Sequence, residues 1–66
     1  LYASIDAKRV MEHVLELPKN YSSVIIMRYI SDLSVQEIAK VLGESENVVS
    51  VRIHRGLSKL KLLVHV

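Results

Sequence analysis

In the C-terminal third of the chain, residues 45–64 read S-E-N-V-V-S-V-R-I-H-R-G-L-S-K-L-K-L-L-V. At about 100° per residue, these residues separate into two faces of one amphipathic helix. The apolar face carries Val49, Ile53, Gly56, Leu60 and Val64. The opposite face carries Asn47, Ser50, Val51, His54, Arg55 and Ser58, with Arg52 and Lys59 on a flank. We expect the first face to enter a core and the second to remain in solvent.

Charge is distributed unevenly along the chain, although the net charge is only +2. Residues 1–46 carry five basic and seven acidic side chains, whereas residues 47–66 carry four basic side chains and no acidic one. A positive helix on a mildly acidic body favours a polyanionic partner. Charge alone leaves a second interpretation open, in which the basic end of a solvated helix complements its own dipole.

Helix-capping residues stand directly before the long helix. Ser45 is its expected N-cap, because a serine hydroxyl accepts a hydrogen bond from the first turn. Gly43 is expected to end the preceding helix, because glycine adopts the left-handed conformation without steric cost. Ser34 and Glu37 have the spacing of a capping box, which predicts the start of a short helix over residues 34–42.

The turn between these two helices has the spacing of a helix-turn-helix, Ala39-x3-Gly43-x5-Val49-x3-Ile53. Ala39 is small, as a close helix crossing requires, and Gly43 makes the turn. Val49 and Ile53 then anchor the second helix on the first. An ordinary helical hairpin uses the same caps and glycine, so the spacing alone leaves that alternative open.

Two further helices are expected upstream. Leu17-Pro18 separates them, because the residue before proline avoids the α region while proline itself is accepted at the first helical position. The first helix has a buried stripe and Ser4 as N-cap. The second is apolar on almost all sides and should be central; its β-branched residues are also compatible with a strand. The predicted fold is a small all-α domain over residues 1–66 with four helices, at about 5–16, 18–30, 34–42 and 45–64, and a C-terminal helix-turn-helix.

Composition argues against several classes of protein. The chain has no cysteine, and His13, His54 and His65 do not recur at ligand spacing, so we expect no metal site and no cofactor. No nucleophile–base pair, carboxylate pair or phosphate loop suggests an enzyme, and we expect no catalytic residue. No apolar run reaches the roughly 18 residues that span a membrane, which favours a cytoplasmic setting. The start at Leu1 rather than methionine favours a fragment of a larger protein.

Five motifs occur together over residues 17–62. They read L-P at 17–18, V-I-I-M-R-Y-I at 24–30, L-S-V-Q-E-I-A at 33–39, L-G at 42–43, and R-I-H-R at 52–55 between Val49 and Leu60. In this combination the chain resembles region 4 of bacterial sigma factors, and most closely that of the extracytoplasmic-function group. The resemblance implies a four-helix domain that recognises the promoter −35 element of double-stranded DNA through its last helix. It also implies docking on the β flap of the RNA polymerase core and masking by an anti-sigma factor.

The resemblance also implies roles for individual residues. The base-facing residues would be Ser50, Val51 and Arg55, and the backbone contacts would come from Arg52, Lys59 and Ser34. Chemistry adds detail to this expectation, because arginine binds guanine through two hydrogen bonds and valine contacts a thymine methyl group. Asn47 and Ser50 have groups that bond to base edges or phosphates, and His54 is a further candidate.

Three positions depart from the family pattern. Family members often have a basic residue at Ser50, a small polar residue at Val51 and an arginine at Leu57. Two alternatives stay open, the first of them because of these departures. One is a protein-interaction module that mimics a sigma factor and sequesters an anti-sigma factor. The other is a different helix-turn-helix regulator, such as the DNA-binding domain of a response regulator, which would bind a palindrome as a dimer.

Overall fold

The computed structural model describes the backbone of residues 2–64 and the side chains of residues 8–64. Within that range the chain forms helices and no strand, which confirms the all-α prediction. The elements are α1 (Tyr2–Glu16), α2 (Lys19–Ile25), the π-helical turn η1 (Ile26–Ile30), α3 (Val35–Leu42) and α4 (Glu46–Val64). In the described part of the chain, no helix combines the length and apolar character needed to cross a membrane.

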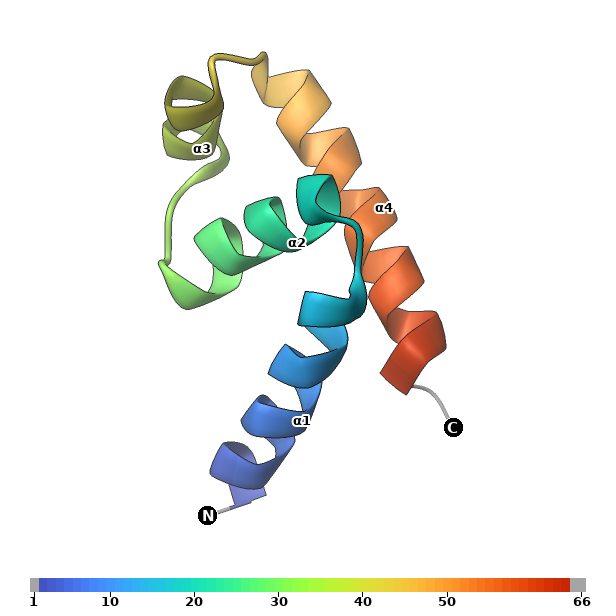
Figure 1. Cartoon of the computed structure of the whole chain (residues 1–66). Coiled ribbons are helices and arrows are strands. Elements are labelled where there is room, and N and C mark those ends of the chain that lie inside the picture. Colours follow the sequence, from blue (N-terminus) through green and yellow to red (C-terminus); the bar gives the residue numbers. More distant parts are fainter. Residues whose placement is uncertain (1, 65–66) are drawn as a thin grey trace.

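The long helix α4 is the element on which the others are assembled (Figure 1). α3 meets the N-terminal end of α4 at an angle and forms the helix-turn-helix with it, while α2 crosses the middle of the molecule and packs mainly against α4. α1 also contacts α4, and the two helices extend toward the same end of the molecule. The arrangement therefore leaves one side of the N-terminal half of α4 uncovered.

The core lies where α2, α3 and α4 meet. Val24, Ile38 and Val49 have the largest completely buried side chains, and one comes from each of these helices. Burying such a side chain stabilises the fold by about 1.5–3 kcal/mol. The buried core residues are Val14, Leu17, Val24, Ile25, Ile38, Ala39, Val49, Ile53 and Leu60. Ala39 is among them, as expected for a small residue at a helix crossing.

A glycine permits the close approach of α2 to α4. A Cβ atom at Gly56 would lie 2.9 Å from Cδ1 of Ile25 and 3.3 Å from Cβ of Tyr21. These distances are shorter than ordinary van der Waals contact between carbon atoms. The absence of a side chain at Gly56 therefore lets α2 lie directly beside the middle of α4, from Tyr21 to Ile25.

The predicted caps of α3 and α4 are confirmed. The Ser34 hydroxyl accepts a hydrogen bond from the Glu37 N–H (3.1 Å), and the Ser34 N–H donates to the Glu37 carboxylate (2.8 Å). Gly43 ends α3 in the left-handed conformation, with φ 68°. The Ser45 hydroxyl accepts from the Val48 N–H (3.1 Å) at the start of α4.

The N-terminal helix boundaries differ from the prediction. α1 begins at Tyr2, so Ser4 lies inside the helix rather than at its N-cap. Residues 1–3 contain no proline or glycine that would end the helix at Ser4. Pro18 holds the N-cap position of α2 with an extended ψ of 146°, and Lys19 is the first helical residue. The Pro18 carbonyl accepts hydrogen bonds from the N–H groups of Tyr21 and Ser22, which starts the helix.

The predicted helix over residues 18–30 is not a uniform, fully packed helix. Its last turn is the π-helical η1, in which the Ser31 N–H donates to the Ile26 carbonyl (2.9 Å). Contrary to the expectation of burial on almost all sides, Tyr29 and Ile30 are 57% and 62% exposed. They lie beyond Val24 and Ile25, the last α2 residues that the core encloses.

The predicted apolar face of α4 is correct at four of its five positions. Val49, Ile53, Gly56 and Leu60 are buried, whereas Val64 is 39% exposed. Val64 is the last residue of α4 and lies one turn beyond Leu60, where the packed part of the helix ends.

Candidate nucleic-acid interface

The side of α4 opposite the core is exposed, as the sequence predicted. Asn47, Ser50, Val51, His54 and Arg55 all lie in solvent within the first three turns of the helix. Burial of Val49 and Ile53 in the core fixes this orientation, because rotating the helix would expose both apolar side chains. The exposed side therefore presents amide, hydroxyl, imidazole and guanidinium groups on one rigid element.

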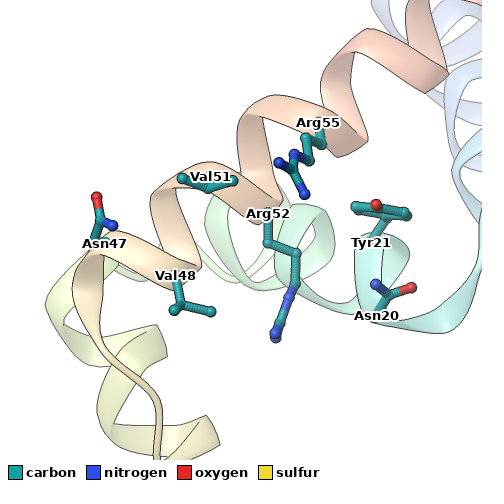
Figure 2. Close-up of a pocket in the computed structure, with 7 residues that line it drawn as sticks. All are labelled: Asn20, Tyr21, Asn47, Val48, Val51, Arg52 and Arg55. Atoms are coloured by element: carbon teal, nitrogen blue, oxygen red, sulfur yellow. The ribbon is translucent and has the colours of Figure 1, made fainter.

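A groove of about 330 Å³ separates the first turn of α2 from this half of α4 (Figure 2). Its lining residues are Asn20, Tyr21, Asn47, Val48, Val51, Arg52 and Arg55. Four of the eight predicted site residues therefore come together here, namely Asn47, Val51, Arg52 and Arg55. The groove also contains Asn20 and Tyr21, which the sequence did not indicate, because only the close approach of α2 at Gly56 brings them to α4.

Arg52 is held by an acidic residue from the turn before α4. Its two terminal nitrogens bond to the two carboxylate oxygens of Glu44, with Nη2 at 3.1 Å from Oε2. These side-chain hydrogen bonds lower the pKa of Glu44 and raise the pKa of Arg52. The sequence indicated Arg52 as a backbone contact but did not indicate Glu44, since residues eight apart do not form a standard helical pair.

Lys59 and Ser34 lie outside the groove. The Lys59 ammonium is 5.5 Å from the centre of the Tyr21 ring, a cation–π distance. Ser34 is exposed at the start of α3, where its backbone and hydroxyl bond to Glu37 and lower the pKa of that carboxyl group. Ser50 and His54 are on the exposed side of α4 but do not line the groove.

The groups on this surface are of the kinds that bind an anion with hydrogen-bonding edges. Guanidinium and ammonium groups bind phosphate, and amide and hydroxyl groups bind either phosphates or base edges. Among the described residues, no three histidine, cysteine or acidic side chains are grouped so that they could hold a metal ion.

Comparison with known proteins identifies sigma factors as relatives of this chain. The chain is 40% identical over 47 residues to RNA polymerase sigma factor SigV of Bacillus subtilis (strain 168), covering 71% of this chain and 28% of SigV. It is 38% identical over 52 residues to ECF RNA polymerase sigma factor SigW of the same organism, covering 79% of this chain and 28% of SigW. RNA polymerase sigma factor YlaC, also from that organism, is 33% identical over 61 residues, with 92% of this chain and 35% of YlaC covered.

The chain thus spans about a third or less of the length of these relatives. No solved structure matches it significantly. The profile of the family described as Sigma-70, region 4, matches residues 7–60, which include α2, α3 and most of α4. The chain belongs to the sigma-70 region 4 family.

Proposed function

We propose that this domain binds the −35 element of double-stranded promoter DNA as part of an extracytoplasmic-function sigma factor that directs RNA polymerase to initiate transcription. The observation that carries the proposal is the exposed side of α4, which is free along its first three turns and lies next to the α3–α4 turn. In a helix-turn-helix, the second helix enters the major groove and its N-terminal residues contact base edges.

Individual side chains on α4 suit this role. Arg55 has the fork of donors that binds guanine O6 and N7, and Val51 offers a methyl surface for thymine. Asn47 and Ser50 reach base edges or phosphates from the first turns, and Arg52, Lys59 and Ser34 supply backbone contacts. His54, exposed beside Arg55, is the remaining candidate for a phosphate or base contact.

Selection of duplexes from a random library tests this proposal. The chain, tethered to the polymerase flap, is expected to enrich one asymmetric site of about one major-groove turn. Binding to that site should weaken steeply with salt, because each neutralised phosphate contributes a slope of about −0.9 to log K against log [salt]. Fluorescence anisotropy over a salt series measures the slope.

Other outcomes point to other functions. Enrichment of a palindrome with a dimer-sized footprint would instead indicate a regulator of the response-regulator type. Enrichment of no sequence, with a salt slope near zero, would contradict promoter recognition altogether. A scrambled duplex of the same composition serves as the control for sequence preference.

A second surface suits the polymerase. An apolar groove of about 350 Å³ lies between α1, the α2–η1 segment and the second half of α4. Its lining residues are Val10, Met11, Val14, Ile25, Ile26, Tyr29, Ile30, Leu57 and Leu60. Because this groove uses a different side of α4 from Asn47 and Arg55, the domain has room to hold DNA and polymerase together. We assign the groove to the polymerase because the relatives are named RNA polymerase sigma factors.

Substitution of Ile30 with glutamate should weaken binding to RNA polymerase core at least tenfold. The side chain is 62% exposed at the groove, so the fold tolerates the charge, but a partner covering it would bury an unpaired carboxylate. Leu62→Glu is the matched control, since Leu62 is 80% exposed and does not line the groove. Equal loss in both variants in a pull-down on polymerase core would contradict this assignment.

The apolar groove also gives a reason to keep a second candidate function, a sigma mimic that sequesters an anti-sigma factor. Leu57, one of the positions that departs from the family pattern, is half-buried and lines this groove. Tight binding to an anti-sigma factor, without any duplex binding at low salt, is the result that favours the mimic over promoter recognition.

A further inference from the structure

The Glu44–Arg52 pair connects the turn of the helix-turn-helix to the flank of the recognition helix. Both terminal nitrogens of Arg52 bond to the Glu44 carboxylate, one to each oxygen. The Arg52 side chain is 23% exposed and that of Glu44 is 35% exposed, so solvent reaches the pair. In Figure 2 the guanidinium groups of Arg52 and Arg55 lie apart from each other, although both residues line the same groove.

Glu44 therefore changes the electrostatics of the groove. The groove-lining residues include two cations, Arg52 and Arg55, and no acid. One of the two cations is neutralised by a carboxylate that stands just outside the lining. A phosphate that approaches Arg52 meets donors already in use and a negative charge beside them, and like charges repel at this range.

We propose that Glu44 is an intramolecular competitor of DNA phosphate for Arg52, so that it limits the affinity of the domain for any duplex without altering its sequence preference. The inference rests on the proposed DNA-binding function. The pair is exposed, and exposed ion pairs contribute little net stability, so a phosphate can displace the carboxylate. Arg52 then exchanges one anion for another, and the net gain from its phosphate contact is smaller than that of an unpaired arginine.

The arrangement of the two hydrogen bonds indicates that Glu44 competes with DNA phosphate for Arg52 and does not position Arg52 for DNA. A carboxylate that positions an arginine for a ligand leaves the terminal nitrogens free to face that ligand. Glu44 instead takes both terminal nitrogens of Arg52, which are the donors that bind an anion end-on. Removing the carboxylate but keeping its shape should therefore strengthen DNA binding, whereas a positioning residue would weaken it.

Glu46 provides a matched control. It is an exposed acid two residues further on, in the first turn of α4, and it makes no ion pair within the described part of the chain. Glu46→Gln and Glu44→Gln make the same change in net charge close to the same helix end. The difference in DNA affinity between the two variants separates the effect of the pairing with Arg52 from the effect of the change in net charge.

The test measures binding of the chain to a short labelled duplex of random sequence and to its selected duplex, over a salt series. Glu44→Gln is expected to bind both duplexes about two- to fivefold more tightly at low salt, the range of an exposed ion pair. Its salt slope should stay close to that of the wild type, because Arg52 neutralises one phosphate in both complexes. Glu46→Gln should show at most a small gain and an unchanged slope.

Arg52→Ala completes a double-mutant cycle with Glu44→Gln. In the wild-type background the arginine change should cost less than twofold, and in the Glu44→Gln background it should remove the whole gain. Additive effects would overturn the inference, as would a Glu44→Gln variant that binds no better than Glu46→Gln. If none of the variants binds either duplex at low salt, the proposed function fails, and that result differs from additive effects in a chain that does bind.

A measurement on the free and bound chain is independent of affinity. The carboxyl ¹³C chemical shift of Glu44 reports its pairing with Arg52 and should change on titration with the random duplex, as the arginine is released. A shift at Glu44 that stays unchanged at saturation, while amide signals of α4 move, would show that the pair persists in the complex and would overturn the competition.

Discussion

Replacing Ile38 with alanine is expected to lower the free energy of unfolding by about 2–5 kcal/mol, the usual range for deleting a buried isoleucine. Ile38 is completely buried between α3 and the helices that pack on it. A chain of 66 residues has a total stability of only about 3–10 kcal/mol, so the variant should lose a substantial share of it. Urea denaturation followed by circular dichroism measures the loss.

Val41→Ala is the matched control for this experiment. Val41 lies on the same helix, three residues further on, and its side chain is 64% exposed. An exposed substitution of this kind changes stability by at most about 0.5 kcal/mol. If both variants lost the same stability, the side of α3 that faces the core would have to be reassigned, and with it the orientation of the helix-turn-helix.

Replacing Arg55 with alanine is expected to weaken binding to the selected duplex by about 1–3 kcal/mol, or roughly 5- to 150-fold. Arg55 is exposed on α4 at the groove, and the structure gives it no carboxylate partner among the described residues. Loss of a bidentate contact to guanine should also relax the preference at one base pair. Competition binding with a set of single-base variants of the duplex measures both effects.

Lys61→Ala separates recognition from charge in that experiment. Lys61 is an exposed basic residue later on the same helix and does not line the groove. Its removal should lower affinity slightly and equally for all duplexes, without a change in base preference. Equal affinity of wild type and Arg55→Ala for the selected duplex would defeat the assignment of Arg55 as a base-reading residue.

The features that the sequence predicted well are local. The capping box at Ser34 and Glu37, the left-handed turn at Gly43 and the N-cap at Ser45 each depend on residues within one turn of one another. The exposed side of α4 followed from helical periodicity, because Val49 and Ile53 are strongly apolar and determine which side is buried. These local signals were sufficient for the helix-turn-helix and for the direction in which its second helix faces.

The features that the sequence missed depend on tertiary contacts or on weak local preferences. Tyr21 enters the groove because α2 crosses α4 at Gly56, and a crossing point is not encoded within either helix alone. Glu44, in the turn before α4, bonds to Arg52 eight residues further on, and this spacing is not that of a standard helical pair. No proline or glycine occurs in the π-helical turn at residues 26–30, so the sequence predicts a regular helix there.

A partner that binds in the apolar groove would make the stability of the fold depend on the concentration of that partner. A partner segment seated there would touch α1, the α2–η1 segment and α4 at once, and so join parts of the chain that are distant in sequence. Any molecule that binds only the folded state adds to the free energy of unfolding in proportion to the logarithm of its concentration. A partner bound in this groove would therefore raise the melting temperature of the domain, by an amount that depends on the concentration of that partner.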